Sequence, residues 1–323
     1  MKKKLLSVVL VAACALSMVA CGSGNTTKSS ADKTYNVGVI QLVQHPALDA
    51  ATQGFQDALK EKLGDKVVFD VQNASGDSAT CATIANTFVS EQKDLILGNA
   101  TAALQAAVAA TDSIPVLGTS ITDYGTALDI ANWSGSSGKN VSGTCDLAPI
   151  DEQAALILEL FPEAKNIGVL YCTAEANSKY QSDLIRGYLE QKGCTVTEFS
   201  FADSNDIAAV TQAACDASEV IYVPTDNTAA SCTETINSVA SIAGTPIVAG
   251  EEGICSGCGV ATLSISYYDL GYSTGLMAYE ILANGKDIST YPVEFAKDTT
   301  KKYNKTLCDQ LGITVPEGFT AIE

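Results

Sequence analysis

The 323-residue sequence contains one histidine, one arginine and one tryptophan, and each scarcity limits what the protein can do. A single histidine, His45, leaves no second imidazole for a metal site, and no phosphate-binding loop accompanies it. We therefore expect no enzyme activity, no cofactor and no metal. Arg186 is the sole arginine and lies in a predicted helix facing solvent. An anionic ligand would then be held by hydroxyl groups and helix N-termini.

Basic residues are also few: the sequence has 19 Lys and Arg but 37 Asp and Glu. The formal net charge is therefore −18 at pH 7. Nucleic-acid binding needs clustered Lys and Arg, so nucleic acid is disfavoured as a partner. Hydrophobic residues, in contrast, make up 46% of the chain. They supply enough apolar side chains for a core, and the length suits two domains of ordinary size.

The first 34 residues differ in composition from the rest. Three lysines at positions 2–4 precede an apolar run, Leu5 to Ala20, that is short for a membrane span and typical of a secretory signal peptide. The small residues before Cys21 resemble a bacterial lipobox. We predict a signal peptide over 1–20, lipidation of Cys21 and a flexible tether over 21–34, with Cys14 as the less suitable alternative. Loss of the three lysines changes the formal charge from −18 to −21.

Nine further cysteines follow Cys21, an odd number at irregular spacings. The only close pair is Cys255-Ser-Gly-Cys258, in a segment that we expect to be a glycine-rich turn. Free thiols, a local disulfide, and a metal or redox site all remain open for this pair. The cysteines therefore do not decide the function.

The remaining chain alternates short apolar runs with helical patterns, which predicts an α/β protein with parallel sheets covered by helices. The expected strands are 37–43, 67–71, 94–97, 115–117, 167–171, 195–199, 220–223, 246–248 and 260–263. The expected helices include 78–92, 102–110, 152–161, 178–192, 207–217 and 229–243.

This pattern occurs twice. Asn36-Val-Gly-Val-Ile40 recurs as Asn166-Ile-Gly-Val-Leu170, 130 positions later, and Pro115-Val-Leu117 recurs as Pro246-Ile-Val248, 131 positions later. Two further matches keep the same order and nearly the same offset. We therefore predict two similar lobes with a cleft between them.

Polar residues follow the predicted strands of both lobes, where open α/β folds bind ligands. Thr101 and Ser178 stand at helix starts and suit an α-carboxylate. Asp226 and Glu251 are acids and suit an ammonium group. For Thr101, Ser178 and Asp226 the alternative role is helix capping. His45 is interpreted as a hydrogen-bonding contact and not as a base. The candidate ligand-binding residues are Gln44, His45, Asn99, Thr101, Ser120, Thr122, Glu175, Asn177, Ser178, Asp226, Asn227 and Glu251.

Three segments carry a resemblance: GVIQLVQHPALD at 38–49, VLYCTAEANS at 169–178 and IYVPTDNT at 221–228. They resemble the ABC-transporter substrate-binding lipoproteins that include the tryptophan-binding group, and the resemblance spans residues 35–318. It implies a type 1 periplasmic binding protein, with two Rossmann-like lobes, three crossovers and an amino acid, often aromatic, bound between them. It also brings Ala100, between Asn99 and Thr101, into the predicted cleft.

We expect the first lobe to comprise 35–145 plus about 266–286, and the second lobe to comprise 146–265 plus about 287–323. The predicted protein is a monomeric, lipid-anchored, extracytoplasmic receptor that closes around an amino acid and delivers it to a membrane permease. A nucleoside- or sugar-binding lipoprotein of the same fold and a ligand-presenting sensor subunit are the alternatives. Sugar binding is less favoured, because such sites usually combine stacked aromatics with several polar residues and arginine.

Overall fold

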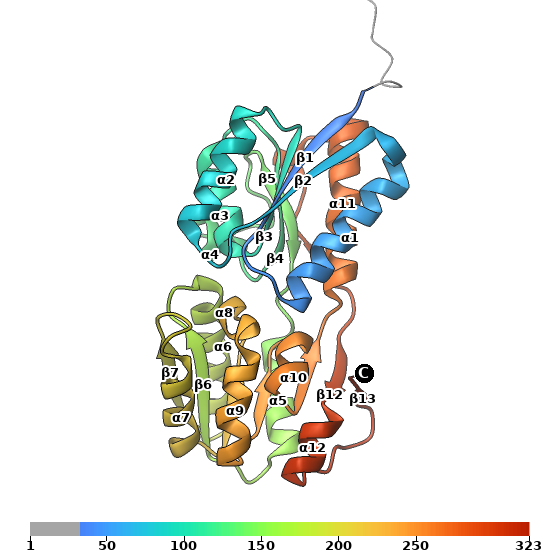
Figure 1. Cartoon of the computed structure of the whole chain (residues 1–323). Coiled ribbons are helices and arrows are strands. Elements are labelled where there is room, and N and C mark those ends of the chain that lie inside the picture. Colours follow the sequence, from blue (N-terminus) through green and yellow to red (C-terminus); the bar gives the residue numbers. More distant parts are fainter. Residues whose placement is uncertain (1–32, 323) are drawn as a thin grey trace, which may run out of the picture. The chain divides into compact units, whose positions relative to one another are not determined.

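The computed structural model describes residues 33–322. The predicted signal peptide, Cys21 and all but the last two residues of the tether lie outside the described residues. The described chain forms two sheets, one of six strands in the order β11-β5-β4-β3-β1-β2 and one of seven in the order β13-β12-β10-β9-β8-β6-β7 (Figure 1). The predicted α/β class with two parallel-dominated sheets is confirmed. We call each sheet with its covering helices a lobe.

The first lobe is formed by the chain up to β5 and by a later segment that contains α11 and β11. Its strands are β1 (Tyr35–Gln41), β2 (Val67–Asn73), β3 (Leu95–Asn99), β4 (Val116–Ile121), β5 (Val141–Cys145) and β11 (Glu294–Phe295). Its helices are α1 (Pro46–Leu63), α2 (Ser78–Ser90), α3 (Thr101–Ala110), α4 (Tyr124–Leu128) and α11 (Tyr267–Asn284), with 3-10 turns at Gly64–Lys66 and Ile288–Thr290.

The second lobe repeats the same alternation. Its strands are β6 (Asn166–Cys172), β7 (Thr195–Phe201), β8 (Val220–Val223), β9 (Ile247–Ala249), β10 (Ala261–Ser264), β12 (Thr300–Tyr303) and β13 (Thr320–Ala321). Its helices are α5 (Ile150–Leu160), α6 (Ala176–Gln191), α7 (Ile207–Ala217), α8 (Asn227–Ser231), α9 (Thr233–Ala243), α10 (Glu252–Cys258) and α12 (Lys305–Leu311). Every pairing is parallel except that of β10 with β12.

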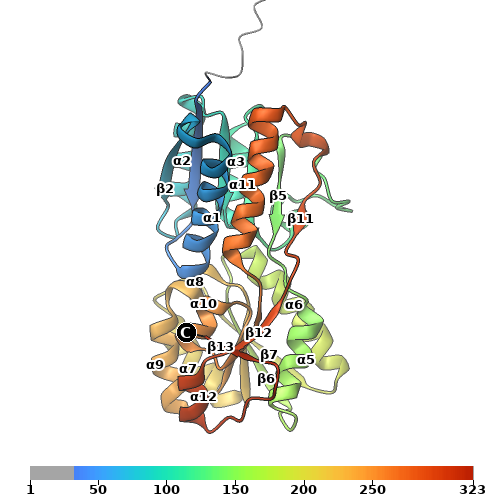
Figure 2. The same cartoon turned by 90° about the vertical axis from the view of Figure 1, so that its right-hand side faces the viewer.

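The chain passes between the sheets three times, after β5, after β10 and after β11 (Figure 2). The last passage corrects one predicted boundary. The second lobe was expected to resume at about residue 287, but Glu294 and Phe295 pair with Thr144 and Cys145 of β5. The segment up to β11 therefore belongs with the first sheet.

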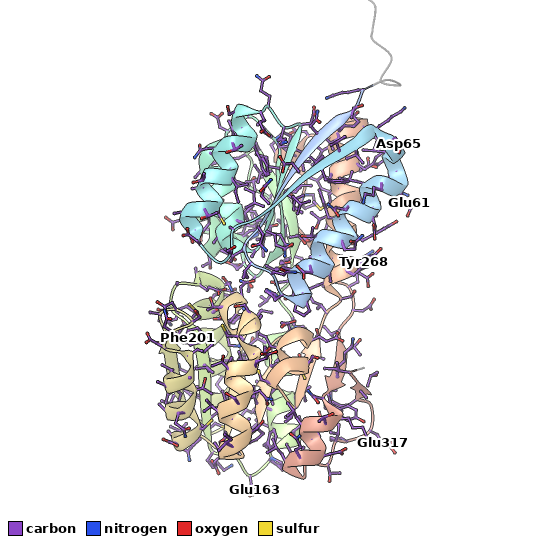
Figure 3. The ribbon with its side chains drawn as sticks, in the orientation of Figure 1. Glu61, Asp65, Glu163, Phe201, Tyr268 and Glu317 are labelled. Carbon is purple, nitrogen blue, oxygen red and sulfur yellow. The ribbon has the colours of Figure 1, made fainter. Side chains whose placement is uncertain are left out.

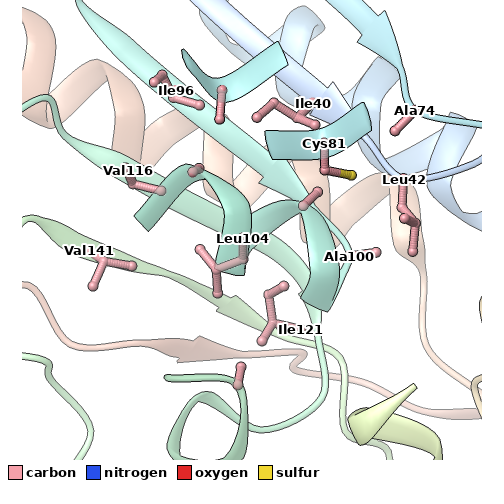
Figure 4. Close-up of a cluster of buried hydrophobic side chains, with 14 of the residues drawn as sticks. Ile40, Leu42, Ala74, Cys81, Ile96, Ala100, Leu104, Val116, Ile121 and Val141 are labelled. Carbon is pink, nitrogen blue, oxygen red and sulfur yellow. The ribbon is translucent and has the colours of Figure 1, made fainter. Parts of the chain in front are cut away.

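Each sheet is apolar on both faces because helices cover both. Alternate residues of β1 point to opposite sides, so that Ile40 contributes to a cluster beneath α2 and α3, whereas Val37 and Val39 pack beneath α1 and α11. Figure 4 shows the first cluster, with Ile40, Ile96 and Leu104 buried together. The second lobe is built the same way, from one cluster with α5 and α6 and another with α7 and α9.

Two predicted details differ from the structure. The helix expected over 229–243 is divided at Cys232 into α8 and α9, and α8 begins two residues earlier because Asp226 caps it. The segment from Cys255 to Cys258 lies in α10, not in a glycine-rich turn. Both of these thiols are free and buried, and each donates to a backbone carbonyl of its own segment.

Residues 271–275, GYSTG, match the letters of a GxSxG nucleophile elbow but lie inside α11, not in the strand-to-helix turn that the elbow requires. Their glycines instead bring α11 against α1. A Cβ atom on Gly271 would lie 2.0 Å from the carbonyl oxygen of Ala51, and one on Gly54 would lie 2.1 Å from that of Tyr268. Figure 3 shows Tyr268 beside α1, where its hydroxyl donates to Asp57 Oδ2 at 3.2 Å. Within residues 33–322, no helix has the length and apolar character needed to cross a membrane.

Gly271→Ala should lower the free energy of unfolding by about 1–3 kcal/mol, because the added methyl group meets backbone atoms that cannot move aside. Gly187→Ala is the matched control, since Gly187 also lies in a helix, α6, and an added Cβ there meets no atom within 4 Å. It should stabilise by about 0.5–1 kcal/mol. Urea unfolding of both variants measures the difference, and equal effects would contradict this account of the helix contact.

Candidate functional site

A small buried cavity lies where the carboxyl ends of strands from both lobes meet. Its volume is about 10 Å³, room for about one water molecule. First-lobe residues on its wall are His45, Leu48, Ser120, Thr122 and Asp146. The remaining lining residues are Asn177, Thr225, Asp226, Asn227, Ala230, Glu251 and Tyr267.

Three polar atoms of this cavity are buried without a hydrogen-bond partner in the described chain: His45 Nδ1, Ser120 Oγ and Asp146 Oδ1. A buried polar group without a partner costs about 1–3 kcal/mol, and more if it is charged. Ser120 also has a φ of +57°, a conformation that costs a non-glycine residue energy. Unpartnered atoms gathered around one cavity require an explanation, and a polar group bound in the cavity would supply one.

Asp146 directly follows β5, at the first passage between the lobes. Its Oδ2 accepts a hydrogen bond from the Tyr267 hydroxyl at 2.9 Å, while Oδ1 has no partner. Burial raises the pKa of Asp146, and the nearby hydroxyl groups of Tyr267 and Thr122 act in the opposite direction. The carboxyl group is therefore fixed in orientation, with one oxygen available.

His45 precedes α1 and reaches across to the second lobe, where its Nε2 lies 3.2 Å from Asn227 Oδ1. Asn227 Nδ2 donates to Glu175 Oε2 at 2.6 Å, and this bond turns the amide oxygen toward His45. Nε2 must then donate. Burial lowers the pKa of His45, which favours the neutral ring. In a neutral ring the proton is on only one nitrogen; because Nε2 carries it, Nδ1 can only accept a hydrogen bond.

Three other carboxylates near the cavity already have backbone partners. Asp226 accepts from Cys172 N at 2.7 Å and, as the N-cap of α8, from Ala229 N at 2.8 Å. Glu175 accepts from the backbone N–H groups of Asn227 and Thr228, and Glu251 caps α10. These acids hold the loops of the second lobe in place.

Burial shifts the ionisation of two of these carboxylates, and neighbouring negative charges add to the shift. Burial raises the pKa of Glu251 to about 7, although its bonds from the backbone N–H groups of Gly253 and Ile254 lower it. Burial and the nearby charge of Glu175 raise the pKa of Asp226. The cavity therefore loses negative charge as the pH falls toward neutrality.

A second bond between the lobes lies beside the first. Gln181 Nε2, from α6, is 3.5 Å from Thr122 Oγ1 of the first lobe. The same Gln181 side chain accepts from Thr225 Oγ1, so its position depends on the β8 loop. Together with the bond between His45 and Asn227, it joins the two sides of the cavity.

The structure brings seven of the predicted residues to the cavity and leaves six outside its wall. Those on the wall are His45, Ser120, Thr122, Asn177, Asp226, Asn227 and Glu251. Those outside it are Gln44, Asn99, Ala100, Thr101, Glu175 and Ser178. Gln44 is exposed, and Asn99 donates to Leu48 O and Thr52 Oγ1, thereby holding α1. Ala100 has a φ of +86° just before α3, so its conformation is strained.

Sequence reasoning missed Leu48, Asp146, Thr225, Ala230 and Tyr267. Asp146 is the most consequential of these. The strand that precedes it, Val-Ser-Gly-Thr-Cys, has too few large apolar residues to be read as buried, although all five are buried. Recognition of that strand would have identified Asp146 by the same rule that found Ser120.

Two larger cavities adjoin the small one. The first, of about 550 Å³, shares Ala230, Glu251 and Tyr267 with it. The second, of about 230 Å³, shares Asn227 and is also lined by Glu175 and Ala102. A ligand anchored in the small cavity therefore has space on both sides.

Comparisons with known proteins identify the family and the fold. The family model for ABC transporter substrate binding proteins matches residues 36–322. A tyrosine-binding protein of Clostridioides difficile (strain R20291) is 37% identical over 308 residues, covering 92% of this chain and 89% of that protein. These relatives are substrate-binding proteins and not enzymes, as the sequence predicts.

Solved structures share the fold. An ABC domain in complex with L-Trp from Streptococcus pneumonia has a TM-score of 0.85 at 34% identity, covering 90% of this chain and all of that one. The ligand-free, open structure of a substrate binding protein with adhesive properties from Clostridium difficile has 37% identity but a TM-score of 0.69, covering 90% and 99%. A leucine binding protein from Thermotoga maritima, at 15% identity and a TM-score of 0.57, covers 78% of this chain and 83% of its own and shares the type 1 periplasmic binding protein fold alone.

Glu251→Gln should change how stability depends on pH. A carboxyl group whose pKa is raised in the folded state binds protons more tightly there than in the unfolded chain, so its contribution favours folding at low pH and is lost as the pH rises to about 7. The wild type should therefore lose stability relative to the variant between about pH 5 and 7, by at most about 1.4 kcal/mol per pH unit. Urea unfolding of both proteins measures this difference, and a constant difference across that range would contradict the ionisation assigned to Glu251.

Proposed function

The chain belongs to the family of ABC transporter substrate-binding proteins, and from that premise we propose that it binds an aromatic amino acid between its lobes. The observation that carries the proposal is the group of three unpartnered buried atoms, His45 Nδ1, Ser120 Oγ and Asp146 Oδ1, at one interlobe cavity. The relative named for tyrosine and the structural neighbour with L-Trp support the aromatic class of ligand.

We assign the α-ammonium group of the ligand to these three atoms. An ammonium group has three donors and no acceptor, and the site offers a carboxylate oxygen, an imidazole nitrogen that can only accept and a hydroxyl. The carboxylate supplies the opposite charge that a buried cation requires. Asp226, the residue predicted from sequence for this role, has both oxygens bonded to backbone N–H groups, so we assign it to capping α8 and bracing Cys172.

We assign the α-carboxylate to the side of the site nearest α3. Thr101 begins this ten-residue helix, whose first N–H groups have no partner within it. Ala102, in the first turn, lines the 230 Å³ cavity beside the ammonium site. Ser178 was the other predicted carboxylate contact, but it is fully buried and bonds to Asp226, so its role is to support that residue.

The mechanism that we propose is closure of the lobes around the ligand. A cavity with room for about one water cannot admit an aromatic amino acid while the lobes are together, so the ligand must enter with them apart. The bonds from His45 to Asn227 and from Gln181 to Thr122 would form on closure. The better structural match to the L-Trp complex than to the ligand-free, open structure supports such a motion.

We further propose that the protein is an extracytoplasmic, monomeric lipoprotein that delivers its ligand to an ABC permease. Family membership supports the transport role, and the lipobox-like sequence before Cys21 supports the anchor. Trp133 stacks on Tyr124 at 5.8 Å and is not among the residues lining the cavity, which gives no support to a sugar-binding site.

Calorimetric titration with the twenty amino acids, common nucleosides and sugars tests the ligand class. We expect binding of L-tyrosine, L-tryptophan or both, and no detectable binding of the nucleosides and sugars. Binding of a nucleoside without binding of any aromatic amino acid would contradict the proposal.

Asp146→Asn should weaken binding of the aromatic amino acid by about a hundredfold or more, because a buried ammonium group loses its counter-charge. The asparagine oxygen can still accept from Tyr267, so the fold should survive. Asp226→Asn is the matched comparison, since asparagine also caps helices, and a smaller loss is expected. A larger loss in Asp226→Asn than in Asp146→Asn would move the ammonium contact back to Asp226.

Cys21→Ser should release the protein from membranes when it is expressed in a bacterium that processes lipoproteins. Fractionation followed by immunoblotting measures the soluble and membrane-bound shares, with Cys14→Ser as the control that should remain anchored. Continued membrane association of Cys21→Ser would point to Cys14 or to an uncleaved N-terminal segment.

A further inference from the structure

The two cavities beside the ammonium site differ in volume, about 550 Å³ against about 230 Å³. The larger one, which we call the side-chain chamber, is formed by Pro46, Ala47 and Ala50 of α1 on one side and by Ile265, Tyr267 and Tyr268 on another. The smaller one combines apolar residues such as Leu42 and Val43 with polar ones such as Ser75 and Asp203. An apolar ring gains free energy in proportion to the area that it buries, and the larger cavity has more room for it.

Tyr267 connects the ammonium site to the side-chain chamber. Its hydroxyl donates to Asp146 Oδ2, while the residue also lines both the small cavity and the chamber. A ligand whose ammonium group binds Asp146 would therefore have its side chain directed along Tyr267. Aromatic rings favour offset or edge-on contact with one another, so this wall suits an aromatic side chain.

The chamber also has a polar end, provided by the second lobe. Lys302 and Glu252 form an ion pair at 2.6 Å and both line the chamber, as do Thr233 and Ser256. These groups offer both donors and acceptors to a polar atom at the tip of a ring. The phenol hydroxyl of tyrosine and the indole N–H of tryptophan are such atoms, whereas phenylalanine, leucine and isoleucine have none.

We propose that the side-chain chamber is the specificity site of the protein and selects aromatic side chains that carry a polar group. The inference rests on the proposed amino-acid function, because it needs the ammonium group to be held at Asp146. It assigns a distinct task to each side of the cleft: the α-carboxylate lies toward α3, and the side chain lies toward α1 and α10.

Two substitutions that narrow the chamber from opposite lobes test this assignment. Ala50→Leu adds bulk from α1 and Ser256→Leu adds bulk from α10; neither side chain is fully buried, so both variants should fold. Ala102→Leu is the comparison variant, because it adds the same bulk at the side assigned to the α-carboxylate, which all three amino acids share, and it should weaken all three by similar factors. Thermal melting confirms folding, and calorimetry with L-tyrosine, L-tryptophan and L-phenylalanine gives the affinities.

Both chamber variants should weaken L-tryptophan binding by about tenfold or more, with L-tryptophan affected more than the smaller L-phenylalanine. Wild-type protein should bind L-tyrosine more tightly than L-phenylalanine. Unchanged affinities in the chamber variants, with a loss of side-chain discrimination in Ala102→Leu, would overturn the chamber assignment and leave the proposed function intact. A wild type that binds no aromatic amino acid would overturn the proposed function itself.

Discussion

The unpaired oxygen of Asp146 is the constraint on which the cleft depends. Asp146 stands at the first passage between the lobes, its second oxygen is held by Tyr267, and both residues are buried. A buried carboxylate with one oxygen unpaired opposes the closed arrangement, and a cation that enters the cavity would remove that penalty. In the proposed mechanism, ligand binding and lobe closure are coupled through this one electrostatic interaction. It would let a receptor with a single arginine recognise a charged amino acid.

The second lobe orients side chains of the site and does not itself supply the charge that we assign to the ammonium contact. Glu175 orients Asn227, Asn227 fixes the proton on His45 Nε2, and His45 Nδ1 is left as an acceptor on the cavity wall. This chain of hydrogen bonds crosses from one lobe to the other, so His45 has its accepting tautomer fixed only while the lobes are together. In the proposed mechanism the lone histidine is a contact whose tautomer is set by closure, and its interpretation as a hydrogen-bonding residue and not a base stays a prediction.

The two-lobed fold could be predicted from the sequence, because buried parallel strands are continuous apolar runs and the second lobe repeats the pattern of the first. Residues at the ends of those strands, such as Ser120 and Asp226, could be predicted for the same reason. The strand before Asp146 could not, since it is made mostly of small and polar residues and is buried only by its neighbours. Thr101 and Ser178 share the strand-end position with the cavity residues, but only tertiary packing sets which of these side chains reach the cavity.

Recognition of the ammonium group at Asp146 is the central claim, and a comparison of ligands tests it without altering the protein. Calorimetry would compare L-tyrosine and L-tryptophan with their deaminated analogues, 3-(4-hydroxyphenyl)propionate and indole-3-propionate, which keep the ring and the carboxylate. We expect each analogue to bind at least about a hundredfold more weakly than its parent, because a site built around a donor group rejects a ligand that lacks it. Equal affinity of an amino acid and its deaminated analogue would contradict the account.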